Sequence, residues 1–351
     1  SVLYENMKAI CEQGADFIYT DELTFQGATK NITVAHFKPD FAIDNLRANN
    51  YICHFTVFQK SLLEKVGLFR SECDGSQDFD MVLRLTEQAQ KIVHIPKPLY
   101  FWRSHAQSVA SSVGAKPYVI QAAKKAIGDH LKRVGLDGEA LDSVVPSMYR
   151  LKYEIKGEPL ISILIPNKDH VSDLRKCIVS IQEKTSYPNY EIIVIENNSE
   201  EEKTFQYYQL LEKRRNIRVV CWNGKFNYSA INNFGYTFAK GEYILLLNND
   251  TEVISADWLQ EMLMYAQRGD VGAVGAKLYY PDNTVQHGGV VLGVGGVAAH
   301  LHCNRQKEDP GYMGRLIYAQ DLTAVTAACM MLPRKVWEET GGLDESFEVA
   351  F

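Results

Sequence analysis

Short uninterrupted apolar runs alternate along this chain with segments whose apolar residues recur at a helical spacing. The run from Tyr243 to Leu247 and the runs at 160–165 and 191–195 predict buried strands, because strands covered on both faces are apolar throughout. Residues 171–182 lie between two of these runs and show the spacing of an amphipathic helix. The alternation predicts an α/β fold, with a mostly parallel open sheet and flanking helices.

Polar residues follow each predicted strand directly. They are Pro166, Asn167, Lys168 and Asp169 after the first strand, Glu196, Asn197, Asn198 and Ser199 after the second, and Asn248, Asn249 and Asp250 after the third. Ligands of open α/β sheets bind beyond the carboxyl ends of the strands, so three such ends predict a polar crevice. A carboxylate there can hold a divalent ion whose other ligands are phosphate oxygens, which makes Asp250 a candidate metal ligand. Taken alone, Asn248 to Asp250 could equally form a turn that caps the helix beginning near Asp257.

Two weak similarities in the same order indicate a tandem duplication. Residues 1–12 and 256–266 are both helical in pattern, and aligning Gly14 with Gly269 pairs Ser1 with Ala256. The second similarity joins FQKSLLEKVG, residues 58–67, to LPRKVWEETG, residues 332–341. Chance similarity between amphipathic helices is the alternative interpretation.

The duplication predicts three segments. The back part of a first copy spans residues 1–110, a helical connecting segment spans 111–156, with its helix over 116–141, and the front part of a second copy spans 157–351. Because the chain begins with Ser1 inside a predicted helix and has no signal peptide, we expect an internal piece of a longer protein. Each copy is then incomplete, and we expect the exposed sheet edge and apolar face of the first to be disordered, repacked or dimerised.

Composition narrows the function classes. A net charge of -6 and a pI near 5.9 argue against nucleic-acid binding, which requires clustered Lys and Arg. The seven cysteines are scattered and form no CxxC pair, so we expect neither a disulfide framework nor a zinc knuckle, and a reducing cytoplasm fits best. No apolar run is long enough to span a membrane. Neither GxGxxG nor GxxxxGK[ST] occurs, so phosphate must be held by a metal and side chains rather than by a glycine-rich loop.

Together these motifs resemble the family 2 glycosyltransferases of the GT-A fold. SILIPNKD, IIVIENNS, FNYSAINNFG and LLLNNDTEV stand where that family has its first strand, its acidic nucleotide-binding strand end, a second nucleotide contact and a DxD-like metal motif. Residues 1–110 resemble the acceptor half of a preceding domain, with GSQDFDMVLR similar to an ED-containing acceptor motif. Similar bacterial enzymes, often tandem, add rhamnose or related sugars to O-antigen or other surface polysaccharides.

The resemblance implies particular roles for the strand-end residues. Pro166, Asn167, Asp169, Glu196 and Asn197 would line the base and ribose pocket, Asn232, Asn233 and Asn249 would contact the nucleotide sugar, and Asp250 with Asn248 would bind Mg²⁺ or Mn²⁺ at the diphosphate. Two residues depart from the family pattern, since Glu196 and Asn248 each replace an Asp.

The resemblance also implies a reaction and its partners. A sugar would be transferred from a dTDP-, UDP- or GDP-sugar to a glycan or lipid-linked glycan, with inversion at the anomeric carbon. The transfer would take place near the inner face of the membrane. In the first copy, Asp78 would be the base that removes the proton of the acceptor hydroxyl. Read without the resemblance, Ser76 could cap a helix whose first turn carries Asp78 and Asp80. Two other functions are left open by the sequence. One is a nucleotidyltransferase, although the basic phosphate loop expected after the first strand of that class is missing here. The other is a non-catalytic glycan-binding or scaffolding module.

Other clusters are weaker. His300, His302 and Cys303 form an HxHC pattern with no second ligand pair, so a loop near the acceptor is favoured over a zinc site. His287 could approach the donor or acceptor, or have no role. Trp102, Arg103 and His105 could close over the diphosphate or pack structurally.

Overall fold

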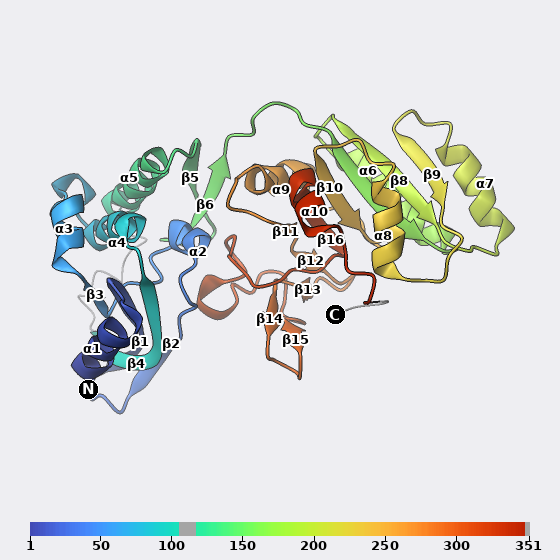
Figure 1. The fold of residues 1–351 in the computed structure, drawn as a ribbon. Helices are drawn as coiled ribbons and strands as arrows, with labels where there is room; N and C mark the ends of the chain where they lie inside the picture. Colours follow the sequence, from blue (N-terminus) through green and yellow to red (C-terminus); the bar gives the residue numbers. More distant parts are fainter. Residues whose placement is uncertain (105–116, 348–351) are drawn as a thin grey trace. The chain divides into compact units, whose positions relative to one another are not determined.

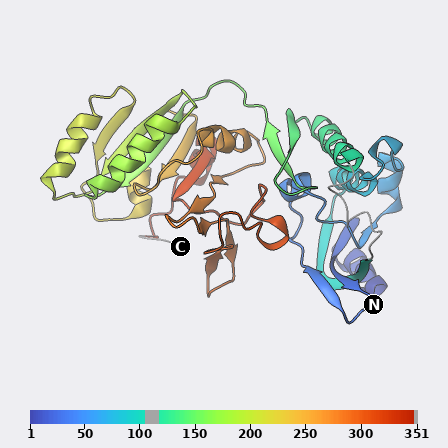
Figure 2. The same cartoon turned by 180° about the vertical axis from the view of Figure 1, so that it is seen from behind.

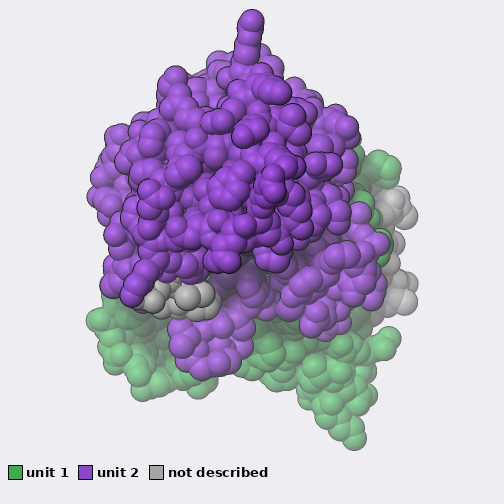
Figure 3. Space-filling view, turned by 90° about the vertical axis from the view of Figure 1, so that its right-hand side faces the viewer, with its two compact units in different colours: residues 1–153, 308–321 green, residues 154–307, 322–351 purple. Residues whose placement is uncertain are grey.

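The computed structural model describes residues 1–104 and 117–347. The chain divides into two compact units, shown in different colours in Figure 3. Unit 1 contains residues 1–153 and 308–321, and unit 2 contains residues 154–307 and 322–351. Figure 1 labels most of the helices and strands.

Unit 2 is built on a six-stranded sheet with the order β11-β16-β10-β7-β8-β9. Its strands are β7 (Ile161–Asn167), β8 (Tyr190–Glu196), β9 (Ile217–Cys221), β10 (Tyr243–Leu247), β11 (Val274–Gly275) and β16 (Cys329–Pro333). The four strands β10, β7, β8 and β9 are parallel, and β16 runs antiparallel to both β10 and β11. The predicted α/β class with a mostly parallel open sheet is therefore confirmed.

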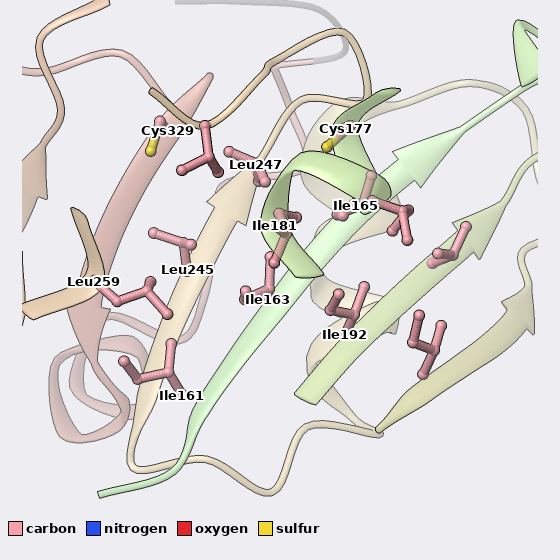
Figure 4. Packing of buried hydrophobic residues seen from close by; sticks show 14 of the residues in the cluster. Ile161, Ile163, Ile165, Cys177, Ile181, Ile192, Leu245, Leu247, Leu259 and Cys329 are labelled. Atoms are coloured by element: carbon pink, nitrogen blue, oxygen red, sulfur yellow. The ribbon is translucent and has the colours of Figure 1, made fainter. Parts of the chain in front are cut away.

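Helices cover both faces of this sheet. Ile163 and Leu245 contribute to a core cluster with α6 (Val171–Lys184), α7 (Glu202–Leu211) and α9 (Trp258–Ala266), whereas Leu164 and Leu246 face α8 (Tyr228–Tyr236) and α10 (Arg334–Thr340). Figure 1 shows α8 and α10 in front of the strands, Figure 2 shows α6 and α9 from behind, and Figure 4 shows the packing of the first cluster. Burial on both faces explains why these strands are apolar at every position. Two hairpins follow, β12 (Leu278–Tyr279) with β13 (Val285–His287) and β14 (Val290–Leu292) with β15 (Ala298–His300).

Unit 1 has a smaller sheet centred on β1. Strand β1 (Phe17–Gln26) pairs antiparallel with β2 (Ile32–His36) and β3 (Thr56–Phe58), and parallel with β4 (Ile92–Ser104). The helices of unit 1 are α1 (Val2–Gln13), α2 (Ile43–Ala48), α3 (Lys60–Val66), α4 (Gln77–Gln88) and α5 (Pro117–Arg133), with short 3₁₀ turns η1 (Ser71–Cys73) and η3 (Tyr312–Gly314). Across residues 1–104 and 117–347, no helix combines the length and apolar character needed to cross a membrane.

The predicted helix over 116–141 is too long. Helix α5 ends at Arg133, and Gly135 follows in the left-handed region with φ of 71°. The chain then forms a hairpin of β5 (Gly138–Asp142) and β6 (Tyr149–Tyr153). Glycine ends the helix here because it adopts positive φ without steric cost.

Residues 308–321 are grouped with unit 1, although the predicted boundaries place them in the second domain. The hydroxyl of Tyr312 donates to the carbonyl of Ala35 at 2.8 Å and accepts the backbone N–H of Phe37 at 2.7 Å. At the other end of the segment, a carboxylate oxygen of Asp321 accepts the backbone N–H of Asp44 at 3.0 Å. These contacts join residues that are distant in sequence, which local patterns do not report.

The carboxylate of Asp80 is the buried anchor of α4. It has no exposed surface and accepts hydrogen bonds from Nε of Arg70 at 3.1 Å and Nε of Arg84 at 2.9 Å. Burial alone raises the pKa of Asp80, but the two guanidinium groups hold that pKa below its usual value. The neighbouring acid Asp78 is exposed in the same helical turn.

We predict that Asp80→Asn lowers the free energy of unfolding of unit 1 by about 3 to 5 kcal/mol, because it leaves two guanidinium groups without their buried counter-charge. Hydrogen exchange of the α4 amides in urea measures the change. Asp78→Asn is the matched control and should change the stability by at most about 0.5 kcal/mol. Equal effects of the two substitutions would contradict the anchoring role of Asp80.

Candidate functional site

The strand order of the unit 2 sheet reverses beside β7: β8 and β9 follow on one side of β7, and the chain then returns to place β10 on the other side. Strand β8 pairs with one edge of β7, and β10 pairs with the other. Because all three strands are parallel, their carboxyl ends lie at the same edge of the sheet. A crevice at such a reversal is the usual ligand site of open α/β sheets.

Asn167 and Asn249 connect two of these strand ends. Nδ2 of Asn249 donates to Oδ1 of Asn167 at 2.6 Å, and Nδ2 of Asn167 donates to the hydroxyl of Tyr208 at 2.7 Å. Asn167 is buried, with 3% of its surface exposed. The end of β7 is therefore fixed to the end of β10 on one side and to helix α7 on the other.

Glu196 ends β8 and shares the same tyrosine. The hydroxyl of Tyr208 donates to Oε2 of Glu196 at 2.6 Å, and Ser199 donates to the carboxylate through its backbone N–H and its hydroxyl. Burial, followed by the hydrogen bond to Glu196, raises the pKa of Tyr208 well above its usual value. The carboxylate of Glu196 is held in a fixed orientation at the end of its strand.

Asp169 and Asn197 hold the loops that border these strand ends. The carboxylate of Asp169 accepts the backbone N–H groups of Glu200 and Glu201 at 3.0 and 2.9 Å, at the start of α7. Although burial raises the pKa of Asp169, these hydrogen bonds lower it below its usual value. Nδ2 of Asn197 donates to the carbonyls of Trp222 and Gly224 at 3.2 and 3.1 Å.

Pro166 and Asn248 lie at strand ends, and the side chain of neither makes a hydrogen bond with a described residue. Pro166 is half-buried near the end of β7, opposite Ile195 of β8. The backbone N–H of Asn248 donates to the carbonyl of Ala328 at 3.0 Å, which continues the β10 and β16 pairing.

The carboxylate of Asp250, three residues after the end of β10, is exposed and makes no hydrogen bond or ion pair with any described residue. Residues 1–104 and 117–347 contain no group of three or more His, Cys, Asp or Glu side chains that could enclose a metal ion. A single free carboxylate fits a magnesium or manganese ion that takes its remaining ligands from water and substrate phosphates.

Asn232 and Asn233 have structural contacts on α8. Asn232 is fully buried, and its Nδ2 donates to the carbonyl of Tyr228 at 2.8 Å. Asn233 donates to the carbonyl of Leu343 and to a carboxylate oxygen of Glu345, and accepts the backbone N–H of Leu343. Neither side chain makes a described contact with the strand-end residues, and Oδ1 of Asn232 is buried without a hydrogen-bond partner. Their expected contact with the nucleotide sugar stays a prediction.

The histidines of the β13–β15 region form a pair. Nδ1 of His287 lies 2.9 Å from Nδ1 of His300, and His287 is buried. Burial, followed by the neighbouring His300, lowers the pKa of His287 to about 4. His287 is therefore neutral near pH 7, and among the described residues the pair belongs to no three-ligand metal group.

Asp78, the candidate base, lies in unit 1 at the first turn of α4. Nδ2 of Asn50 donates to its carboxylate at 3.1 Å. The side chain of Ser76 accepts no capping hydrogen bond from the helix, and its hydroxyl donates to the carbonyl of Val119 at 2.9 Å. Trp102 and Arg103 belong to β4, whereas His105 lies outside the described residues.

Sequence reasoning missed Tyr208, which joins Asn167 to Glu196. Its helix shows only an ordinary amphipathic pattern, and no motif marks this tyrosine. The available signal was a Tyr on the buried face of a helix beside two polar strand ends, because a buried hydroxyl requires a partner.

We predict that Tyr208→Phe lowers the free energy of unfolding of unit 2 by about 1 to 3 kcal/mol, because buried Glu196 and Asn167 each lose a partner. Urea unfolding followed by tryptophan fluorescence measures the change. Tyr207→Phe is the matched control, since the hydroxyl of Tyr207 makes no described hydrogen bond, and it should have little effect. A negligible loss for Tyr208→Phe would contradict the bridging role.

We predict that Asp169→Asn removes about 1 kcal/mol of stability at pH 7, because the amide is a weaker acceptor for the α7 N–H groups than a carboxylate. The folded-state pKa is lowered, so this stabilisation is present above the unfolded-state pKa of about 3.9 and is lost as pH falls through the folded-state value. The stability difference between the two proteins should therefore shrink below about pH 4. A difference independent of pH would contradict the carboxylate role.

Two longer bacterial proteins resemble almost the whole chain. An uncharacterized protein, y4gI, of Sinorhizobium fredii is 45% identical over 96% of this chain and 38% of its own length. The O-antigen biosynthesis protein RfbC of Myxococcus xanthus is 40% identical over 95% of this chain and 26% of its own length. The chain thus spans well under half the length of either relative.

Solved structures resemble parts of the chain more distantly. A mannosyltransferase of Pyrobaculum calidifontis, in complex with GDP-Man and Mn²⁺, has a TM-score of 0.39 at 13% identity and covers 54% of this chain and 49% of its own. TarS 1-349 of S. aureus, in complex with UDP-GlcNAc, has a TM-score of 0.30 at 17% identity and covers 34% of each chain.

The family model described as glycosyl transferase family 2 matches residues 162–341, which is just over half of the chain. The match begins in β7 and ends after α10, so it contains the unit 2 sheet except Ile161, and all of the strand-end residues described above. The resemblance inferred from the motifs, with its GT-A type of α/β fold, is thereby confirmed. The chain belongs to glycosyl transferase family 2.

Proposed function

We propose that unit 2 binds the nucleotide-diphosphate sugar of a glycosyltransferase at the carboxyl ends of β7, β8 and β10. The observation that carries the proposal is the free, exposed carboxylate of Asp250 beside the fixed pair Asn249 and Asn167, at the reversal point of the sheet. Family membership supports sugar transfer from this donor over its synthesis by a nucleotidyltransferase.

The residues that hold the donor divide into two groups. The first group forms the pocket for the base and ribose and consists of Pro166, Asn167, Asp169, Glu196 and Asn197. The second is Asn249, which we assign to the part of the nucleotide sugar near the phosphates. Because Glu196 and Asn167 are already oriented by Tyr208, they can accept or donate hydrogen bonds without first losing side-chain freedom. Occupying the pocket would require a ligand to exchange some of these internal bonds for its own.

Asp250, with Asn248 next to it, would hold Mg²⁺ or Mn²⁺ at the diphosphate. The bound ion would supply charge neutralisation for the departing nucleoside diphosphate. The protein's own contribution is to place one carboxylate and the Asn249 amide beside the leaving group, and to keep the β10 end rigid through its pairing with β7 and β16. Replacement of the usual Asp by Asn248 removes one negative charge from the site.

We further propose that the two units are incomplete tandem copies and that Asp78 is the base of the first. Its carboxylate is exposed and held by Asn50, so it can remove the proton of an acceptor hydroxyl during an inverting displacement. The acceptor is proposed to be a growing bacterial surface polysaccharide or lipid-linked glycan, with rhamnose as the candidate sugar and the cytoplasmic side of the membrane as the place of transfer. The relative named for O-antigen biosynthesis supports this class of acceptor.

We predict that one of dTDP, UDP and GDP raises the melting temperature of the chain in the presence of Mn²⁺. A nucleotide at about 100 times its Kd adds about 2.7 kcal/mol, which shifts the midpoint of a unit of this size by about 5 to 10 °C. Asp250→Ala should abolish the manganese-dependent part of the shift. Thermal unfolding with each nucleotide, with and without Mn²⁺, measures both effects.

Glu252→Ala is the matched control, because Glu252 is an exposed acid two residues further along and should leave the shift unchanged. No shift with any nucleotide, together with binding of glycan, would reject the donor site and favour a glycan-binding module instead. A shift that is the same in Asp250→Ala would reject the assignment of the metal ligand.

A further inference from the structure

Large apolar side chains lie exposed along one side of α1 in unit 1. Leu3, Tyr4 and Met7 are 68%, 64% and 53% exposed, and Ile10 is 36% exposed. Their three- to four-residue spacing places them on one face of the helix. The opposite side of α1 packs on the sheet through the small side chain of Ala9. An apolar stripe of this kind ordinarily faces a protein core.

A cavity lies between the end of this helix and β3. It has a volume of about 260 Å³, and its lining includes Ile10, Ala15, Ile18, Val57 and Phe58. The lining side chains are predominantly apolar, as expected for a site filled by other apolar side chains. The cavity adjoins the exposed stripe through Ile10.

One edge of β3 faces β1, and the other edge has no paired strand among the described residues. The backbone N–H of Gln59 donates to the carbonyl of Asp16 at 2.8 Å, so odd-numbered residues of this segment bond to β1. Backbone groups alternate in direction along an antiparallel pair, which turns the N–H and C=O groups of Thr56 and Phe58 to the other edge. Within residues 1–104 and 117–347, no strand pairs with that edge.

Unit 2 shows what covers the corresponding edge there. Under the alignment of residues 58–67 with 332–341, Thr56 corresponds to Met330 and Phe58 to Leu332, both in β16. Ala328, two residues earlier, accepts the backbone N–H at the end of β10 at 3.0 Å, so the even-numbered residues of this segment bond to β10. The open positions of β3 therefore match the positions that bind β10 in unit 2.

The exposed positions of α1 also correspond to buried positions in unit 2. Under the alignment of Ser1 with Ala256, Tyr4 matches Leu259 and Met7 matches Met262, which are 0% and 4% exposed. Both belong to the core cluster that contains side chains of β10, β7 and α6, and Figure 4 shows Leu259 in this cluster. Two independent features, a helix face and a strand edge, thus lack the same neighbour.

We propose that the face of unit 1 formed by α1 and the open edge of β3 is a docking surface for an α/β segment that resembles residues 157–250 of unit 2. The segment adds a strand antiparallel to β3, and its sheet and helices cover α1. This surface goes beyond the proposed transfer reaction and rests on the alignment of the two units. A second copy of this chain is a poorer occupant, because β10 is already paired with β7 and β16 on its two edges.

A synthetic peptide with the sequence of residues 241–250 tests the surface on the full chain. We expect the peptide to bind by strand addition and to slow hydrogen exchange at the amides of Thr56 and Phe58 at least tenfold. The chain variant Met7→Asp should weaken binding, because it places a charge under the docked segment. Fluorescence anisotropy of labelled peptide and hydrogen exchange provide the two readouts.

Two N-methylated peptides are matched controls. Methylation at Ile244 and Leu246 removes the N–H groups that face the strand edge and should abolish binding, whereas methylation at Leu245 alone should leave it within about threefold. Three results would overturn the proposal: no binding of the unmodified peptide, equal binding of the two methylated peptides, or protection of the Met330 amide in place of the Thr56 amide. A chain that is already dimeric, with Thr56 and Phe58 protected before peptide is added, would overturn it in favour of a second copy.

Discussion

The hydrogen bond from Asn249 to Asn167 joins the ends of β10 and β7, and the geometry of the candidate site depends on it. The sheet behind these residues is apolar and buried on both faces, so the buried polar side chains at its carboxyl edge require hydrogen-bond partners. Tyr208 extends the same network to Glu196 at the end of β8. Three strand ends are thereby held together, and Asp250 is left exposed with its charge free.

The two units differ in what covers their helices and strand edges. In unit 2, α9 and β16 are both packed against β10, and their apolar residues are buried. In unit 1, α1 presents exposed apolar side chains, and within residues 1–104 and 117–347 no strand pairs with the outer edge of β3. Unit 1 also contains a buried charge, because Asp80 of α4 accepts hydrogen bonds from the guanidinium groups of Arg70 and Arg84.

The strands of unit 2 were predictable because burial on both faces leaves an uninterrupted apolar run in the sequence. The polar strand ends at Asn167 and Glu196 were predictable because the apolar run stops there, although both side chains are themselves buried. Tyr208 was not, because its role depends on how α7 packs across two strands. The placement of residues 308–321 was also not predictable, because bonds such as that of Tyr312 to Ala35 join distant parts of the chain. Asn232 matched a family motif, but its burial in α8 is a property of packing that the motif alone does not report.

The most direct measurement of the central claim is paramagnetic relaxation by Mn²⁺ in the presence of a nucleoside diphosphate, observed by methyl NMR of the full chain. The donor site at the carboxyl edge predicts nucleotide-dependent broadening that is strongest for Leu247 and Ile165, near the ends of β10 and β7. Methyl groups at the opposite ends of the same strands, such as Ile161 and Ile244, should broaden less because relaxation falls steeply with distance from the ion. Broadening that is independent of nucleotide, or that is centred away from these strand ends, would contradict the account.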